Sequence, residues 1–88
     1  MTIGAQISLY PLGQSDLGPA IRAVLAALDE HGLLYEVGAM NTTLWGEEAV
    51  VWAALRDAFA RAAAHGGAVM QITLSNACPL PPEGARHD

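Results

Sequence analysis

Four short segments of the chain have the residue pattern of β-strands. Apolar and polar side chains alternate over residues 5–11, which is the two-residue period of a half-buried strand. Residues 34–38 and 42–45 are rich in aromatic and β-branched side chains, and the short loop between them predicts a hairpin. Residues 69–75 alternate in the same way. We therefore expect four strands, of which the second and third are neighbours.

A helix is predicted between the first and second strands. Ser15 or Asp16 can cap its start, and Pro19 then falls in the first turn, where a missing N–H costs little. Gly32 is expected to end this helix. The apolar side chains that recur at helical spacing, and that we expect to face the sheet, are Leu17, Ile21, Val24, Leu25 and Leu28.

A second helix is predicted between the third and fourth strands. Glu47 and Glu48 place negative charge at its start, and the two glycines at residues 66–67 close it. Asp57 and Arg61 lie one turn apart on its outer side. Its predicted apolar face consists of Val51, Trp52, Leu55, Phe59 and Ala62.

The order strand, helix, strand, strand, helix, strand is that of a split βαβ arrangement. Right-handed crossovers place both helices on one face of such a sheet. We therefore expect an α+β fold of ferredoxin-like βαββαβ type, with a four-stranded antiparallel sheet. Residues 1–75 would form its single domain. Residues 76–88 contain three prolines and are expected to form a flexible or extended tail.

The sheet face turned away from the helices is predicted to be polar, with aromatic side chains among the polar ones. Its expected residues are Gln6, Ser8, Tyr10, Thr43, Trp45, Gln71 and Thr73. Such a face can lie in water, pack against a second sheet in an oligomer, or hold a planar polar ligand.

Charge and length restrict the partners. Nine acidic residues outnumber four arginines, there is no lysine, and the net charge is −5. Phosphate backbones require clustered cations, so we expect no nucleic-acid partner. Charged residues interrupt every apolar stretch before it reaches about 20 residues, so we expect no membrane partner. An 88-residue chain has a thin margin of stability, which favours self-association.

The sequence offers little for catalysis or metal binding. His31 and His65 fall in the last turns of the predicted helices, where imidazole favours the negative end of the dipole, and no second ligand stands at a metal-like spacing. Glu47 and Glu48 are adjacent on a helix and do not face one another. The lone Cys78 has no neighbouring base and no disulfide partner. We expect no catalytic residues, no metal and no cofactor, and hence not an enzyme.

The first residues also lack the basic and apolar regions of an export signal. Together with the single cysteine, this predicts a cytoplasmic protein.

Three motifs resemble those of the small thiamine-binding protein family. They are Ile-Ser-Leu-Tyr-Pro-Leu-Gly at residues 7–13, Gly-Leu-Leu-Tyr-Glu-Val at 32–37 and Met-Asn-Thr-Thr-Leu-Trp-Gly-Glu at 40–47. The resemblance spans residues 3–75. It implies ferredoxin-like domains that associate as dimers or tetramers, and binding of thiamine or its hydroxymethylpyrimidine half as ligand.

The chain departs from this family pattern at several positions. The family usually has glutamate at Trp45, glycine at Asn41 and proline at Ala39. It also has arginine and aspartate where this chain has Ala68 and Ser75. These departures predict a changed ligand or a changed mode of binding.

The resemblance and the predicted face together give a candidate ligand site. Its hydroxyls would pair with the edge of a heteroaromatic ring, and Tyr10 or Trp45 would cover the ring face. The candidate residues are Ser8, Tyr10, Met40, Thr42, Thr43, Trp45 and Gln71. In a purely structural interpretation Thr42 and Thr43 are ordinary strand residues and Trp45 packs against another subunit.

Two other functions are compatible with the sequence. One is a ligand-free regulatory or scaffolding oligomer, whose polar face is an interface. The other is a small cofactor-less enzyme of the dimeric ferredoxin-like kind, with a pocket between helix and sheet.

Overall fold

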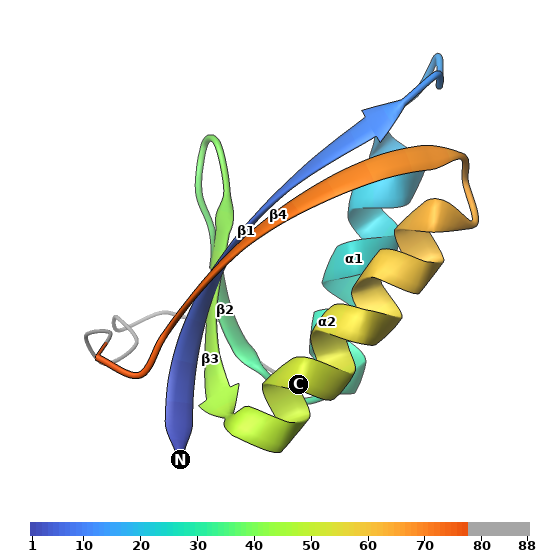
Figure 1. Cartoon of the computed structure of the whole chain (residues 1–88). Helices are drawn as coiled ribbons and strands as arrows, with labels where there is room; N and C mark the ends of the chain where they lie inside the picture. The colour runs from blue at the N-terminus through green and yellow to red at the C-terminus, as the bar shows by residue number, and fades with distance from the viewer. Residues whose placement is uncertain (78–88) are drawn as a thin grey trace.

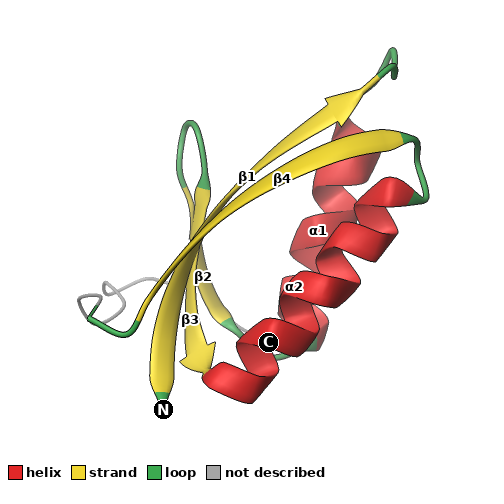
Figure 2. Ribbon diagram, in the orientation of Figure 1, coloured by secondary structure: helices red, strands yellow, loops and turns green. Residues whose placement is uncertain are grey.

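The computed structural model describes residues 1–77 and has the predicted ferredoxin-like order of elements (Figure 1). The four strands form one antiparallel sheet in the order β2-β3-β1-β4, and both helices lie on one of its faces (Figure 2). The elements are β1 (Thr2–Leu12), α1 (Gly18–Glu30), β2 (Leu34–Val37), β3 (Thr42–Glu47), α2 (Glu48–Ala63) and β4 (Gly67–Ser75).

The central strand β1 is longer than predicted because its two partner strands are staggered along it, with β4 reaching beyond the end of β3. Its first half pairs with β3, from Thr2 opposite Glu47 to Ile7 opposite Thr42. Its remainder pairs with β4 alone. Pro11 therefore lies where only one neighbouring strand is present, a position at which a strand tolerates the missing N–H.

The boundaries of α1 follow from local chemistry. Leu17 is the N-cap, so the predicted caps Ser15 and Asp16 were wrong, although Asp16 accepts a hydrogen bond from the Gly18 N–H at 2.9 Å. At the other end Gly32 has a φ of 71°, as a left-handed turn requires. The Leu33 N–H donates to the Leu28 carbonyl at 3.1 Å, which completes a Schellman turn and confirms the predicted end of this helix.

Alanines, rather than the largest apolar residues, form much of the buried face of each helix. On α1 the buried residues are Ala20, Val24, Ala27 and Leu28, and on α2 they are Val51, Ala54, Leu55, Ala58 and Ala62. Small side chains allow the two helices to pack closely against each other, and α1 contacts α2 more extensively than it contacts β2. The helix layer is therefore narrow.

Four residues predicted to face the sheet are instead largely exposed. They are Leu17, Ile21, Trp52 and Phe59. Leu17 precedes α1, and Ile21 lies on the side of α1 that faces the β2–β3 hairpin. Trp52 and Phe59 lie on the side of α2 next to β4. Ile72 and Leu74 of β4 do point to the helix face, as predicted, but remain 41 % and 38 % exposed. The narrow helix layer leaves these side chains uncovered.

A cluster of charged side chains joins the two helices. Arg61 donates to both carboxylate oxygens of Glu30, at 2.7 and 2.8 Å, and to Asp57 at 3.0 Å. Asp57 and Arg61 are one turn apart, as predicted. His31 Nε2 lies 3.1 Å from Asp57, a contact that the sequence did not predict. Arg61, and after it His31, holds the pKa of Asp57 below its ordinary value, and Arg61 does the same to the pKa of Glu30.

Several predictions concern residues near the end of the chain. Only Asn76 and Ala77 of the predicted tail are described, and the Ala77 N–H donates to the Ser75 hydroxyl at 2.9 Å. Cys78 and His87 lie outside the described residues. Within residues 1–77, neither helix has the length and apolar character needed to cross a membrane.

Candidate functional site

The predicted site residues are divided between the two faces of the sheet. The register places Ser8, Tyr10, Thr43, Trp45 and Gln71 on the face away from the helices, and Ser8 lies directly opposite Gln71. Two further candidates lie elsewhere, because Thr42 points to the helix side and Met40 belongs to the loop between β2 and β3. Adjacent residues of a strand point to opposite faces, so Thr42 and Thr43 cannot contact the same small ligand from one face.

Trp45 and Tyr10 differ in how much surface a ligand could reach. Trp45 is only 9 % exposed and lies opposite Gly4 on β1 and Leu34 on β2. Tyr10 is 48 % exposed near the far end of β1. Of the two aromatic side chains predicted to cover a ring, Tyr10 therefore has more accessible surface.

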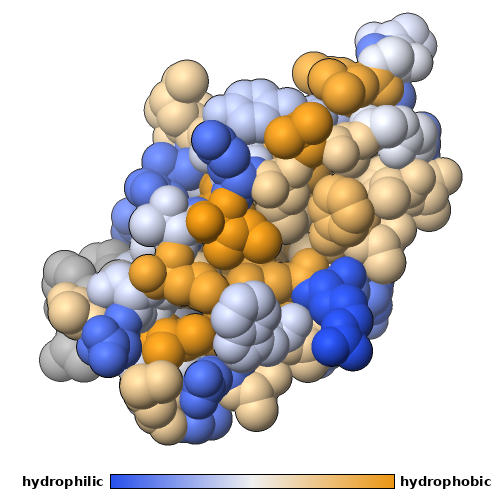
Figure 3. All heavy atoms as spheres, viewed as in Figure 1, coloured by the Kyte–Doolittle hydropathy of each residue, from blue (hydrophilic) through white to orange (hydrophobic). Residues whose placement is uncertain are grey.

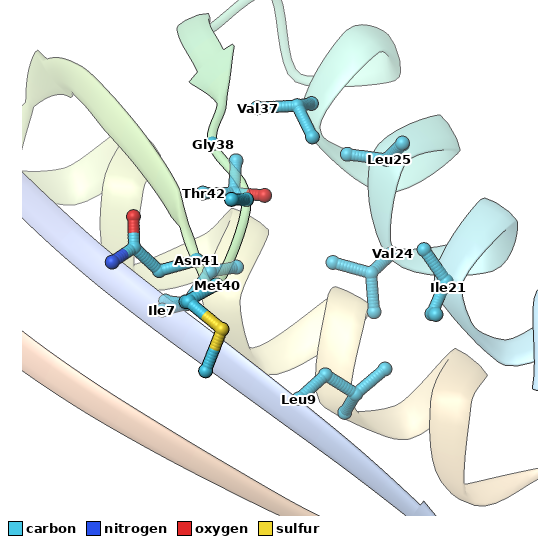
Figure 4. Close-up of a pocket in the computed structure, with 11 residues that line it drawn as sticks. Ile7, Leu9, Ile21, Val24, Leu25, Val37, Gly38, Met40, Asn41 and Thr42 are labelled. Atoms are coloured by element: carbon cyan, nitrogen blue, oxygen red, sulfur yellow. The ribbon is translucent and has the colours of Figure 1, made fainter.

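On the helix side, a cleft of about 310 Å³ separates α1 from the β2–β3 hairpin (Figure 4). α1 provides Ile21, Val24 and Leu25 as one wall, and residues 37–42 of the hairpin form the opposite wall. Ile7 and Leu9 of β1 also line the cleft. Val24 is buried, whereas Ile21 and Leu25 are only partly covered. The walls are thus mainly aliphatic, which suits a flat apolar or aromatic group.

The hairpin also brings polar groups to this cleft. In Figure 4 the Thr42 hydroxyl points across the cleft toward α1, while the Asn41 amide points away from it. The Gly38 N–H donates to the Asn41 carbonyl at 2.7 Å, which closes the loop. The Ser8 hydroxyl lies 3.4 Å from the Met40 carbonyl, a long hydrogen bond that ties the loop to β1. Ser8 therefore supports the hairpin wall of the cleft from the other face of the sheet.

The electrostatic character of the cleft is neutral. Its lining, within the described part of the chain, contains no charged side chain. Its polar side chains there are the Thr42 hydroxyl, which can both donate and accept a hydrogen bond, and the outward-turned Asn41 amide. Such a site can hold a neutral heterocycle by apolar contact and orient it by one or two hydrogen bonds.

Sequence reasoning identified Met40 and Thr42 but missed the α1 wall. Ile21 and Leu25 were assigned to the buried face of the helix, because helical spacing alone does not tell which apolar residues another element covers. The sequence did contain one signal for this wall, the width of the apolar stripe on α1. A narrow helix layer cannot bury every residue of a wide stripe.

A protein-family model described as the YKOF-related family matches residues 2–80 of the chain. No curated protein matches it significantly.

Similar folds occur in solved structures of low sequence identity. A domain of unknown function from Bacillus cereus is 23 % identical, with a TM-score of 0.76 over 85 % of this chain and 75 % of that one. A protein from Streptococcus pneumoniae is 21 % identical, with a TM-score of 0.78 over 85 % and 86 %. A “putative thiamine biosynthesis/salvage protein” from Thermotoga maritima is 21 % identical, with a TM-score of 0.74 over 84 % and 82 %. At this identity the likeness establishes the fold alone.

Proposed function

The chain belongs to the YKOF-related family, and on that premise we propose that it binds a small heteroaromatic molecule of the thiamine or hydroxymethylpyrimidine class without covalent change. The cleft between α1 and the β2–β3 hairpin is the proposed site. The single observation that carries this proposal is the combination of aliphatic walls with the inward-pointing Thr42 hydroxyl. The description of the Thermotoga maritima neighbour as a “putative thiamine biosynthesis/salvage protein” and the motif resemblance support the ligand class.

The chemistry of the cleft suits the pyrimidine half of thiamine. An aminopyrimidine is flat, so it can lie between the side chains of α1 and the hairpin. Its ring nitrogens accept and its exocyclic amine donates, and the Thr42 hydroxyl complements either group. A volume of about 310 Å³ is at the lower end of the usual range for small-molecule sites, about 300 to 1,000 Å³.

The charge of the ligand should matter. Because no carboxylate lines the described cleft, a cationic thiazolium would lose hydration there without gaining an ion pair. We therefore infer that hydroxymethylpyrimidine binds more tightly than intact thiamine.

The proposed activity is binding, not catalysis. Within residues 1–77 the cleft lining provides a threonine hydroxyl and an asparagine amide, with no histidine, carboxylate or thiol beside them. General acid–base and nucleophilic catalysis both require a nucleophile or proton carrier with a partner to activate it. A neutral, aliphatic cleft favours a carrier, buffer or sensor of the ligand.

Calorimetric titration with hydroxymethylpyrimidine, and separately with thiamine, tests the proposal. We expect saturable binding by the wild-type chain. Thr42→Val should weaken it roughly three- to tenfold, the effect of one lost hydrogen bond. Leu25→Trp should abolish it by filling the cleft, and Ile21→Trp should do the same from the exposed rim if the first variant is unstable.

Gln71→Ala and Tyr10→Ala are the matched controls on the opposite sheet face. Both should bind as the wild type does. If these two variants lose binding while Thr42→Val keeps it, the ligand lies on the predicted sheet face and the cleft assignment is wrong. If the wild-type chain gives no heat with either compound, the proposed ligand class is wrong.

A further inference from the structure

The three methionines of the chain differ in exposure. Met40, in the loop between β2 and β3, is 82 % exposed, more than any other large apolar side chain among residues 1–77. Met1 is 60 % exposed, and Met70 of β4 is partly buried against the core. Figure 3 shows that other hydrophobic side chains also reach the surface, in a band across the face in view. Exposure alone therefore does not distinguish Met40.

Met40 is distinguished by its place at the border of the ligand cleft. It lines the cleft from the hairpin side, and Figure 4 shows its thioether extending beside β1. Its main chain is held, because its carbonyl accepts the long hydrogen bond from Ser8 and the Gly38 N–H closes the loop on the Asn41 carbonyl. A methionine side chain has three rotatable bonds and a polarizable sulfur that contacts aromatic rings favourably. Met40 can therefore cover a ring that is bound in the cleft.

We propose that Met40 is an oxidation site, at which a peroxide converts the thioether to a sulfoxide and thereby weakens ligand binding in the cleft. The sulfur lone pair attacks one peroxide oxygen, so that an S–O bond forms as the O–O bond breaks. The sulfur loses two electrons, and the second oxygen takes the proton of the first and leaves as water. Methionine sulfoxide reductases reverse the change, with two thiols removing the oxygen as water and forming a disulfide. The effect on binding rests on the function proposed above, whereas the oxidation itself does not.

The polarity of a sulfoxide opposes ligand binding in this cleft. Its oxygen is a hydrogen-bond acceptor, whereas the thioether is nearly apolar. Within the described lining, the Thr42 hydroxyl is the one side-chain donor that points inward. A sulfoxide turned toward the ligand is therefore buried without a donor, or takes the Thr42 hydroxyl from the ligand. A sulfoxide that stays in water no longer covers the ring, so each arrangement lowers the affinity.

Exposure predicts that the oxidation is selective and leaves the fold intact. A peroxide must reach the sulfur, so Met40 should react before Met70. An added oxygen on Met40 remains in water when the cleft is empty, whereas one on Met70 would lie against the core. Oxidation of Met40 can thus change the cleft without unfolding the chain.

Peptide mass spectrometry after graded exposure to hydrogen peroxide tests the site. The full chain is used in a Cys78→Ser background, which removes the competing thiol. Met40 should be oxidised several-fold faster than Met70. Saturating hydroxymethylpyrimidine should slow the oxidation of Met40 and leave that of Met70 unchanged.

Calorimetric titration with hydroxymethylpyrimidine, before and after oxidation, tests the consequence. Oxidation should raise the Kd roughly three- to tenfold without lowering the unfolding temperature. Met40→Leu, whatever its own affinity, should lose none of it on peroxide treatment. The matched control is Met40→Leu combined with Val69→Met, because Val69 is 47 % exposed and lies opposite Tyr10 on the face away from the helices. Oxidation of the introduced methionine should leave the Kd of that variant unchanged.

Two results would overturn the inference. One is oxidation of Met40 no faster than that of Met70, and the other is an oxidised chain that binds as tightly as the unoxidised one. If the unoxidised chain binds neither hydroxymethylpyrimidine nor thiamine, the proposed function fails and the effect on binding fails with it. The peptide analysis still decides in that case whether Met40 is the preferred oxidation site.

Discussion

Ile21 and Phe59 are equally exposed, at 43 %, but they lie in different surroundings. Ile21 lies on α1 in a cleft whose opposite wall is the β2–β3 hairpin. Phe59 lies on α2 in a groove bordered by the edge strand β4. Ile21 thus lies in a cleft that the hairpin and β1 also line. Phe59 lies in a groove with Ile72 of β4, and the outer edge of β4 has no strand partner within residues 1–77.

This difference shows that exposed apolar area does not by itself identify a function. A concave surface with a polar group can enclose a small molecule. An apolar strip beside a free strand edge can instead be covered by another chain. The ligand site proposed above therefore lies on the α1 side, where the exposed apolar residues line a cleft that also contains a hydroxyl.

The largest effect is expected from comparing a core residue with an exposed residue of α2. Leu28 is fully buried, so Leu28→Ala should lower the free energy of unfolding by about 3 kcal/mol at every protein concentration. Phe59 is 43 % exposed, so Phe59→Ala should lower the same free energy by only about 1 kcal/mol. Urea unfolding measures both losses. Equal losses in the two variants would contradict the difference in burial.

The glycines that lead from each helix to the next strand should differ more modestly. Gly66, between α2 and β4, has a φ of 141°, which other residues almost never adopt, so Gly66→Ala should cost about 2 kcal/mol. Gly32, between α1 and β2, has a φ of 71°, so Gly32→Ala should cost about 1 kcal/mol. Gly67→Ala is the control for lost backbone freedom, because Gly67 has no positive φ and a Cβ there would meet its nearest atom, Leu12 Cβ, at 3.5 Å. Thermal unfolding ranks the three, and an equal cost at Gly32 and Gly66 would argue against the φ-based explanation.

The smallest effect concerns the charged cluster that joins the two helices. The pKa values of Asp57 and Glu30 lie below their ordinary 3.8 and 4.5 because Arg61 donates to both carboxylates. The folded chain thus holds these protons less tightly than the unfolded chain. The resulting stabilisation is complete above about pH 5 and is lost as the pH falls through the lowered values.

Asp57→Asn should therefore lose less stability than the wild type between about pH 7 and pH 3. Urea unfolding at the two pH values measures the difference, and Asp29→Asn on α1 is a suitable control because no ion pair involves Asp29 among residues 1–77. The same pH dependence in wild type and Asp57→Asn would show that the cluster contributes nothing.

Features with local causes were predicted well from the sequence. Gly32 ends α1 because a left-handed residue is needed there, and Pro19 lies in the first turn because that turn needs no N–H. The order of strands and helices followed from the spacing of apolar residues. Asp57 and Arg61 met because residues four apart on a helix are neighbours.

Features that depend on distant segments were not predicted. His31 pairs with Asp57 only because α1 and α2 lie side by side. The ligand cleft requires Ile21 of α1 and Thr42 of β3, which the hairpin and the crossover bring together. Nothing in the local pattern separates Thr42 from Thr43, and only the register with β1 assigns them to opposite faces.

The sequence by itself determined the elements, their order, the acidic charge and the uncharged character of the last strand, since each is a property of neighbouring residues or of composition. Only the tertiary structure decided which apolar residues are covered, because burial depends on what packs above a residue and not on the residue itself. Alanines at 54 and 58 are buried while Trp52 and Phe59 stay exposed. Because α1 and α2 pack closely together, they leave the cleft beside α1 and the β4 edge uncovered.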